Sequence, residues 1–242
     1  MSHRIRLGML TPSSNTALEP ITSAMLAGLP EVSAHFGRFK VTEIALSEQS
    51  QQQFNDSEIL RAAELLAHAK VDVIAWNGTS ASWLGFERDE RLCERILAAT
   101  GIKAATTTLA YREILHLAGS KRIGLVTPYT DDVQAKIIAN WAASGLTVTA
   151  ERHLGISDNF AFAEIEEATI ARMSREVAAE GCDLVVILCT NMRGAALAER
   201  LEAMTSVTVY DSIAVTLWKC LAVAGVDAAR IRGWGRLFTV RG

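Results

Sequence analysis

The sequence predicts an α/β protein of two doubly wound lobes, each built on a parallel sheet of about four strands. The first observation behind this prediction is an internal repeat. The segments 5–16 (IRLGMLTPSSNT) and 122–132 (RIGLVTPYTDD) both run from a short apolar strand through Thr-Pro into a polar turn. A second pair follows in the same order, 71–80 (VDVIAWNGTS) and 182–191 (CDLVVILCTN). Two halves of the chain should therefore share one fold.

The second observation is that strand-like and helix-like patterns alternate along the whole chain. Several strands are near-continuous apolar runs, which is typical of a parallel sheet covered on both faces. Alternating strands and helices imply right-handed βαβ units. No linker is rich in glycine or serine, so we expect the two lobes to pack closely.

The first half is expected to hold four strands and four helices. Asp56 and Ser57, followed by Glu58, are typical of a helix start and predict the beginning of the second helix. The expected strands are Ile5–Leu10, Phe39–Leu46, Val71–Trp76 and Lys103–Thr106. The expected helices are Thr16–Leu26, Ser57–Ala69, Arg88–Thr100 and Leu109–Ala118.

The second half repeats this series. We expect its last helix, which follows the last predicted strand, to cross back and complete the first lobe. The predicted lobes are then 1–118 with 212–242, and 119–211, with the active site between them. The expected strands are Arg122–Thr127, Thr147–Leu154, Leu184–Cys189 and Val207–Tyr210. The expected helices are Asp132–Ser144, Phe162–Ala179, Ala195–Met204 and Ile213–Ala224.

Composition narrows the class of protein. Half of the 242 residues are hydrophobic, which is ample for a buried core. The net charge of −3 gives no basic field, which argues against a nucleic-acid partner. No apolar run resembles a signal peptide or a membrane span, so a cytoplasmic protein without a membrane partner is expected. The four cysteines form no CxxC pair and the histidines show no metal spacing, so no metal site is expected.

Polar clusters follow the predicted strands of both halves. They are Thr11–Thr16, Asn77–Ser80, Thr127–Asp132 and Cys189–Asn191. In open parallel sheets, ligands bind at the carboxyl ends of the strands. The sequence therefore predicts a small-molecule site where these four turns meet.

Cys189 is the candidate catalytic residue. Aligning the second repeat pair places Gly78 opposite Cys189, so one thiol stands among the four turns. A free cysteine is often only a small buried hydrophobe. Its place after a strand and before an expected helix start favours a reactive thiol with a lowered pKa. Cys93, Cys182 and Cys220 are expected to be structural.

Other residues of the turns are candidates for binding a carboxylate or an oxyanion. Gly78, Thr79 and Ser80 offer backbone N–H groups and hydroxyls, although an ordinary strand-to-helix turn has the same composition. Ser14 and Asn15 open a helix, where they either cap it or help bind an anion. The remaining candidates are Tyr129, Asn159, Thr190 and Asn191, while Trp76, Trp83 and Leu46 are candidates for the walls of a side-chain pocket.

These motifs together resemble the aspartate/glutamate racemase superfamily, in its maleate cis–trans isomerase and arylmalonate decarboxylase branch. The motifs are GMLTPSSNTALEP at 8–20, NGTSAS at 77–82, TPYTDDV at 127–133, LGISDN at 154–159, LCTN at 188–191 and GWGRLF at 233–238. The resemblance implies two flavodoxin-like lobes related by a pseudo-twofold axis, and no metal or organic cofactor.

The resemblance also assigns roles. Racemases and maleate isomerases of this family carry one cysteine in each lobe; the first would fall at Gly78 and the second matches Cys189. Arylmalonate decarboxylases have only the second. By that likeness Thr79, Ser80 and Tyr129 surround a departing carboxylate, and Cys189 protonates the enediolate that remains.

The match is mixed, however. Asn15 and Asn159 match asparagines that hold carboxylates in maleate isomerases and are missing from arylmalonate decarboxylases. Thr190 and Asn191 also replace the glycine pair of those decarboxylases. We therefore expect a cofactor-independent enzyme that acts on a small mono- or dicarboxylate through Cys189, with a malonate-type decarboxylase as the first choice. The alternatives are a maleate-type or racemase-like isomerase and a non-catalytic carboxylate-binding protein, and a homo-oligomer is an open option.

Overall fold

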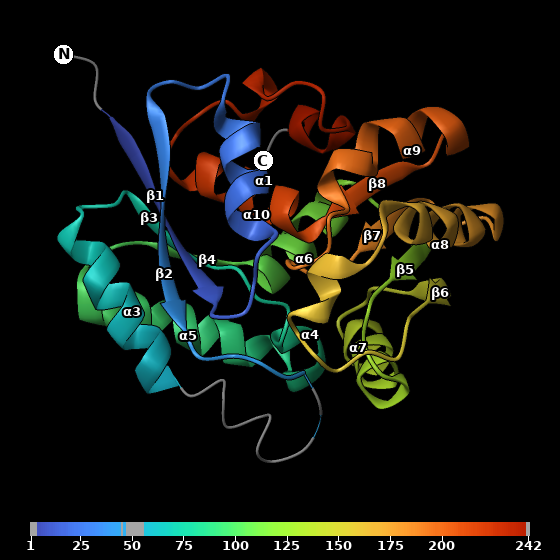
Figure 1. The fold of residues 1–242 in the computed structure, drawn as a ribbon, viewed down its shortest axis with the longest axis horizontal. Helices are drawn as coiled ribbons and strands as arrows, with labels where there is room; N and C mark the ends of the chain where they lie inside the picture. Colours follow the sequence, from blue (N-terminus) through green and yellow to red (C-terminus); the bar gives the residue numbers. More distant parts are fainter. Residues whose placement is uncertain (1–3, 45, 47–55, 241–242) are drawn as a thin grey trace.

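Two four-stranded parallel sheets form the frame of the molecule. Figure 1 shows the computed structural model, which describes residues 4–44, 46 and 56–240. The first sheet has the order β2-β1-β3-β4, with β1 (Ile5–Pro12), β2 (Val32–Phe39), β3 (Val73–Trp76) and β4 (Ala104–Thr106). The second has the order β6-β5-β7-β8, with β5 (Ile123–Val126), β6 (Val148–Arg152), β7 (Leu184–Ile187) and β8 (Thr208–Asp211). The identical doubly wound orders confirm the predicted fold class.

The register of the two sheets reproduces the internal repeat. In the first sheet Leu10 pairs with Trp76, and in the second Val126 pairs with Ile187. The sequence repeat aligns Leu10 with Val126 and Trp76 with Ile187. The two halves are therefore equivalent residue by residue at the centres of their sheets, which are also the strands buried on both faces.

Helices cover both sheets (Figure 1). Around the first sheet lie α1 (Leu18–Leu26), α3 (Asp56–His68), α4 (Ala81–Leu84), α5 (Phe86–Thr100) and α6 (Thr107–Leu117). Around the second lie α7 (Asp131–Ala143), α8 (Glu167–Ala179) and α9 (Ala198–Thr205), with the 3₁₀ turns η1 (Ala161–Glu164) and η2 (Ala195–Leu197). The chain ends with α10 (Ser212–Val223) and the 3₁₀ turns η3 (Ala228–Arg230) and η4 (Arg236–Thr239). The last helix, α10, packs on β3, β4 and α1 of the first half. The exact lobe boundaries stay a prediction.

The second strand is the clearest error of the sequence-based prediction. We expected it at Phe39–Leu46, but β2 spans Val32–Phe39 and pairs along its whole length with β1. It is an edge strand, and most of its side chains are only half-buried, so it lacks the apolar run that marked the other strands. Residue 45 of the expected strand lies outside the described part of the chain.

The segment that was expected to be this strand crosses to the other half instead. Glu43 and Asp158 form an isolated antiparallel bridge. On either side of it the Ile44 N–H donates to the Ser157 carbonyl at 2.8 Å, and the Asn159 N–H donates to the Thr42 carbonyl at 3.0 Å. These bonds fix Asn159 next to residues 41–44.

Further differences concern helices. The observed starts of α1, α5, α6 and α9 differ from the expected ones by two or three residues. The helix expected from Phe162 begins at Glu167, because the chain first makes the 3₁₀ turn η1. The short helix α4 was not expected, nor were the two 3₁₀ turns after α10. α3 begins at Asp56 itself, one residue before the expected start.

Candidate active site

A small cavity lies where the carboxyl ends of the two sheets meet. We call it the Cys189 cavity. Its volume is about 20 Å³, which is room for about one water molecule. A carboxylate can therefore enter only if part of the wall moves. The lining residues are Pro12, Val41, Ile44, Trp76, Gly78, Thr79, Ser80, Trp83, Tyr129, Asn159, Cys189 and Thr190.

The structure brings seven of the ten predicted site residues to this cavity. They are Gly78, Thr79, Ser80, Tyr129, Asn159, Cys189 and Thr190. Gly78 and Cys189 each stand two residues beyond the end of a central strand, β3 and β7, so both halves present a turn to one space. Trp76 and Trp83 line it as expected, whereas Leu46 is not among its lining residues.

Cys189 is a buried thiol, only 3% exposed. Burial raises its pKa to about 12, against the opposing effects of the Asn191 N–H and the Tyr129 hydroxyl. The Asn191 N–H lies 3.4 Å from Sγ. We expected a lowered pKa from a helix start, and that expectation was wrong: a turn follows Cys189 and helical structure begins only at Ala195. In this closed cavity the thiol is therefore protonated at neutral pH.

A pair of hydroxyls stands beside the thiol. Thr79 Oγ1 and Tyr129 Oη are 2.6 Å apart, and both side chains are buried. Burial, and next the nearby Cys189, raise the pKa of Tyr129 well above 10, so its hydroxyl stays neutral. The rings of Trp83 and Phe162 hold the phenol at centroid distances of 5.3 and 5.6 Å. One of the two hydroxyls donates to the other, and the Tyr129 hydroxyl also hydrogen-bonds the Cys189 side chain.

Asn15 and Asn191 are not among the residues that line the cavity. The Asn15 amide donates to the Thr190 carbonyl at 2.9 Å, and its oxygen accepts the N–H groups of Ala17 and Leu18. Asn191 accepts two N–H groups at the start of the same helix and donates to the Asn159 carbonyl. Their polar atoms are thus used to join the two halves.

Ser14 also lies behind the cavity wall. Its hydroxyl donates to the Val41 carbonyl at 2.7 Å and accepts from the Asn159 amide at 2.7 Å. Ser14 therefore orients Asn159, whose side chain does line the cavity.

Asp211 is a residue near the site that sequence reasoning missed. It ends β8, is 1% exposed, and caps α10 by accepting the N–H groups of Ile213 and Ala214. Burial raises its pKa to about 7, and its charge raises the pKa of Cys189. The signal was available, because Asp211 is another polar residue that directly follows an apolar strand.

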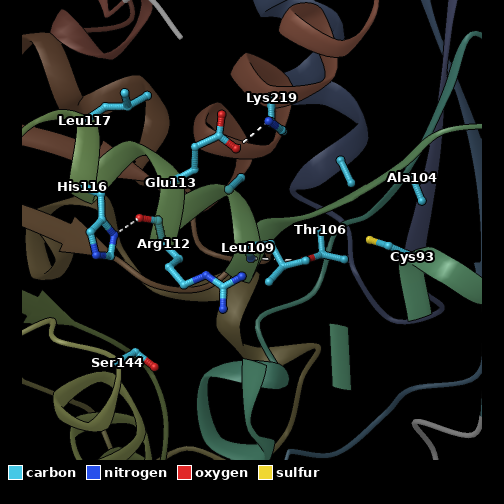
Figure 2. A pocket seen from close by; sticks show the side chains of 12 residues that line it. Cys93, Ala104, Thr106, Leu109, Arg112, Glu113, His116, Leu117, Ser144 and Lys219 are labelled. Atoms are coloured by element: carbon cyan, nitrogen blue, oxygen red, sulfur yellow. Dashed lines mark hydrogen bonds and ion pairs between the residues drawn. The ribbon is translucent and has the colours of Figure 1, made fainter. Parts of the chain in front are cut away.

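A larger groove of about 770 Å³ lies away from this site, along α6 (Figure 2). Its charged side chains are paired: Lys219 with Glu113 at 2.5 Å, and Arg112 with Glu90 at 2.6 Å. Its only thiol, Cys93, has a pKa raised to about 12 by burial and by nearby carboxylates. The groove therefore offers no evident chemistry.

The described residues offer neither a metal-binding cluster nor a membrane-spanning helix. Within residues 4–44, 46 and 56–240, no three His, Cys, Asp or Glu side chains gather in a way that could hold a metal ion. In the same ranges no helix has the length and apolar character needed to span a bilayer. The expectations of no cofactor, no nucleic acid and a cytoplasmic location stay predictions, as does the oligomeric state.

Two equivalent α/β halves with a thiol between them are consistent with the aspartate/glutamate racemase superfamily. The family model described as arylmalonate decarboxylase matches residues 7–238, so the chain belongs to that family. It is 30% identical over 241 residues to a maleate isomerase of Pseudomonas putida, covering 94% of each chain. It is 27% identical over 236 residues to the arylmalonate decarboxylase of Bordetella bronchiseptica, covering 96% of this chain and 95% of that one.

Solved structures agree on the fold. The maleate isomerase Iso of Pseudomonas putida S16 superposes with a TM-score of 0.89 at 24% identity, covering 97% of this chain and 98% of that one. A buried thiol with a raised pKa also fits the non-catalytic carboxylate-binding alternative. The named relatives are nevertheless enzymes, and this chain aligns with nearly their whole length. The prediction of an enzyme is therefore confirmed.

Proposed function

We propose that this enzyme acts on a small carboxylate in the Cys189 cavity, and that Cys189 delivers a proton to a carbanion formed by loss of CO2. The observation that carries the proposal is that Cys189 is buried beside the Thr79–Tyr129 hydroxyl pair and is the one thiol among the residues that line the cavity. Burial also raises the pKa of this thiol to about 12. A protonated thiol is the form that a general acid needs.

The chemistry follows from the residues around the thiol. Thr79, Ser80 and Tyr129 supply hydroxyls that hold the substrate as charge develops on it. When the C–C bond to the leaving carboxylate breaks, its electron pair stays on the substrate as an enediolate, and CO2 departs. The Cys189 S–H then gives its proton to the α-carbon, and the thiolate is reprotonated from water. One thiol suffices because only one proton is delivered.

Maleate-type cis–trans isomerisation is the second candidate. Likeness to known proteins favours it over decarboxylation, since the relative at 30% identity is a maleate isomerase. A neighbouring structure is a mutant Nocardia farcinica maleate cis–trans isomerase with a covalently bound succinylcysteine intermediate. Here Cys189 would have to lose its proton and add to the double bond. The Asn191 N–H and the Tyr129 hydroxyl, which both lower the pKa of the thiol, would support that step.

One experiment separates the candidates. The protein is incubated in D2O with a series of 2-substituted malonates and with maleate, and NMR follows the products. We expect CO2 release and one deuterium at the α-carbon of the product. Cys189→Ala should abolish this, whereas Cys182→Ala, at a buried thiol outside the cavity, should not. Conversion of maleate to fumarate without CO2 would establish the second candidate instead.

A further inference from the structure

We propose that Trp76 determines how much space the cavity keeps on its Gly78 side, and thereby limits the site to one thiol and to a narrow substrate. The part that concerns substrate width rests on the proposed function. The part that concerns the thiol rests on geometry alone.

The indole of Trp76 occupies the space that a side chain at position 78 would need. A Cβ atom built on Gly78 would lie 2.0, 2.2 and 2.7 Å from three carbon atoms of that ring. Real Cβ atoms essentially never come within 3.0 Å of such a neighbour. Gly78 is also not among the described residues with a positive φ, so its backbone does not call for glycine. The glycine is required by the indole.

Trp76 cannot easily move aside. Its backbone is paired on both edges, with Leu10 of β1 and Thr106 of β4. Its side chain is 1% exposed, and its ring lies 5.0 Å from that of Phe39. Close packing of this kind resists even a small added volume.

The other half shows the opposite arrangement. The residue equivalent to Trp76 is Ile187, and two positions later stands Cys189 in place of glycine. In the first half the large indole of Trp76 is followed two residues later by glycine. In the second half the smaller side chain of Ile187 is followed two residues later by a thiol. The site has a thiol on one side only because the volume of a side chain at position 78 is taken up by the Trp76 indole.

The test of the first part is a double-mutant cycle read by thermal unfolding. Gly78→Cys alone should lower Tm by about 5 °C or more through overpacking. Trp76→Ile copies the second half and should lower Tm through the cavity that it leaves. The double variant should unfold no lower than Trp76→Ile alone, because the new side chain fills that cavity.

Trp141→Ile is the matched control, because Trp141 is 0% exposed and does not line the cavity. Combined with Gly78→Cys, it should give additive losses. If Gly78→Cys is insoluble, soluble protein should return with Trp76→Ile and not with Trp141→Ile. An unchanged Tm in Gly78→Cys, or additive losses in the pair with Trp76→Ile, would overturn the proposal.

The second part of the proposal, that Trp76 limits the width of the substrate, is tested with substrates of different size. For 2-substituted malonates of increasing bulk, Trp76→Ile should raise kcat/KM for the bulky acid over the small one by about tenfold or more. An unchanged ratio would overturn this part. If the unaltered enzyme releases no CO2 from any malonate, the proposed function fails, while the unfolding cycle still decides the role of Trp76.

Discussion

At the scale of single residues, Cys189 carries the proposed chemistry. We expect Cys189→Ser to lower kcat by about 10²–10⁴-fold, the usual contribution of a general acid, with the fold retained. The measurement is steady-state decarboxylation beside a thermal melt. Cys220→Ser removes a thiol that is fully buried in α10 and outside the cavity, so it should change stability and not kcat. A Cys189→Ser enzyme with more than about a tenth of normal kcat would contradict the role as general acid.

The hydroxyl pair beside the thiol acts as one unit. Thr79→Val and Tyr129→Phe each break the contact of 2.6 Å, and each should lower kcat by about 10²-fold. The double variant should be little worse than the more damaged single one, because the effects of coupled groups do not add. Ser174→Ala is the control: it breaks a buried hydrogen bond of 2.8 Å to the Ile170 carbonyl within α8, and neither residue lines the cavity. Additive losses would mean that the two hydroxyls act separately.

At the scale of elements, the protonation of Asp211 at the start of α10 should make the free energy of unfolding depend on pH. Burial raises its pKa to about 7 in the folded protein, from an ordinary value near 3.8 in water. Between those values the folded state binds a proton that the unfolded state has lost. Stability should therefore fall as pH rises from about 4 to 7, by at most about 4 kcal/mol, and level off above.

Urea unfolding of Asp211→Asn across this range measures the effect. The amide keeps an oxygen for the N–H groups of Ile213 and Ala214, so α10 remains capped. The difference in unfolding free energy between the two proteins should change with pH between 4 and 7 and then stay constant. A difference that is flat throughout would show that Asp211 is ionised in the folded protein.

The elements also show what a sequence can predict. The central strands β1, β3, β5 and β7 were found because strands buried on both faces are apolar without interruption. β2 was missed because an edge strand has no such run. The cavity residues of the turns were found because parallel strands end at one edge. By contrast, the structural use of Asn15 and Asn191 depends on partners some 175 residues away, which no local pattern reveals.

At the scale of the whole molecule, the two halves are joined by hydrogen bonds next to the residues that line the Cys189 cavity. Asn191 accepts the N–H groups of Thr16 and Ala17, which belong to the first half, and donates to Asn159. α10 adds an apolar contact by packing on β3 and β4. Because the same contacts hold the site and join the halves, we expect both halves to unfold in one transition.

Two thiols outside the cavity can report on this coupling. Cys93 lies in the first half and Cys182 in the second, and most of each side chain is covered in the folded protein. During heating, pulses of iodoacetamide followed by mass spectrometry should label both with one midpoint. Asn191→Ala leaves the Thr16 N–H and the Asn159 carbonyl without their side-chain partner, while the Ala17 N–H keeps Asn15. It should therefore lower that common midpoint by about 5–15 °C, or about 2–4 kcal/mol.

Asn140→Ala is the control, since it removes a single part-buried hydrogen bond to the Ser82 carbonyl. We expect it to shift the midpoint by only about 2–4 °C, in keeping with about 1 kcal/mol for one bond. If Asn191→Ala instead separates the midpoints of Cys93 and Cys182, the halves are independent folding units that happen to touch. If the common midpoint holds, the residues that shape the site also make the two sheets one cooperative structure. For a substitution among these contacts, thermal unfolding must then be measured together with activity. Only a variant that keeps its Tm can show that a loss of activity comes from the catalytic step.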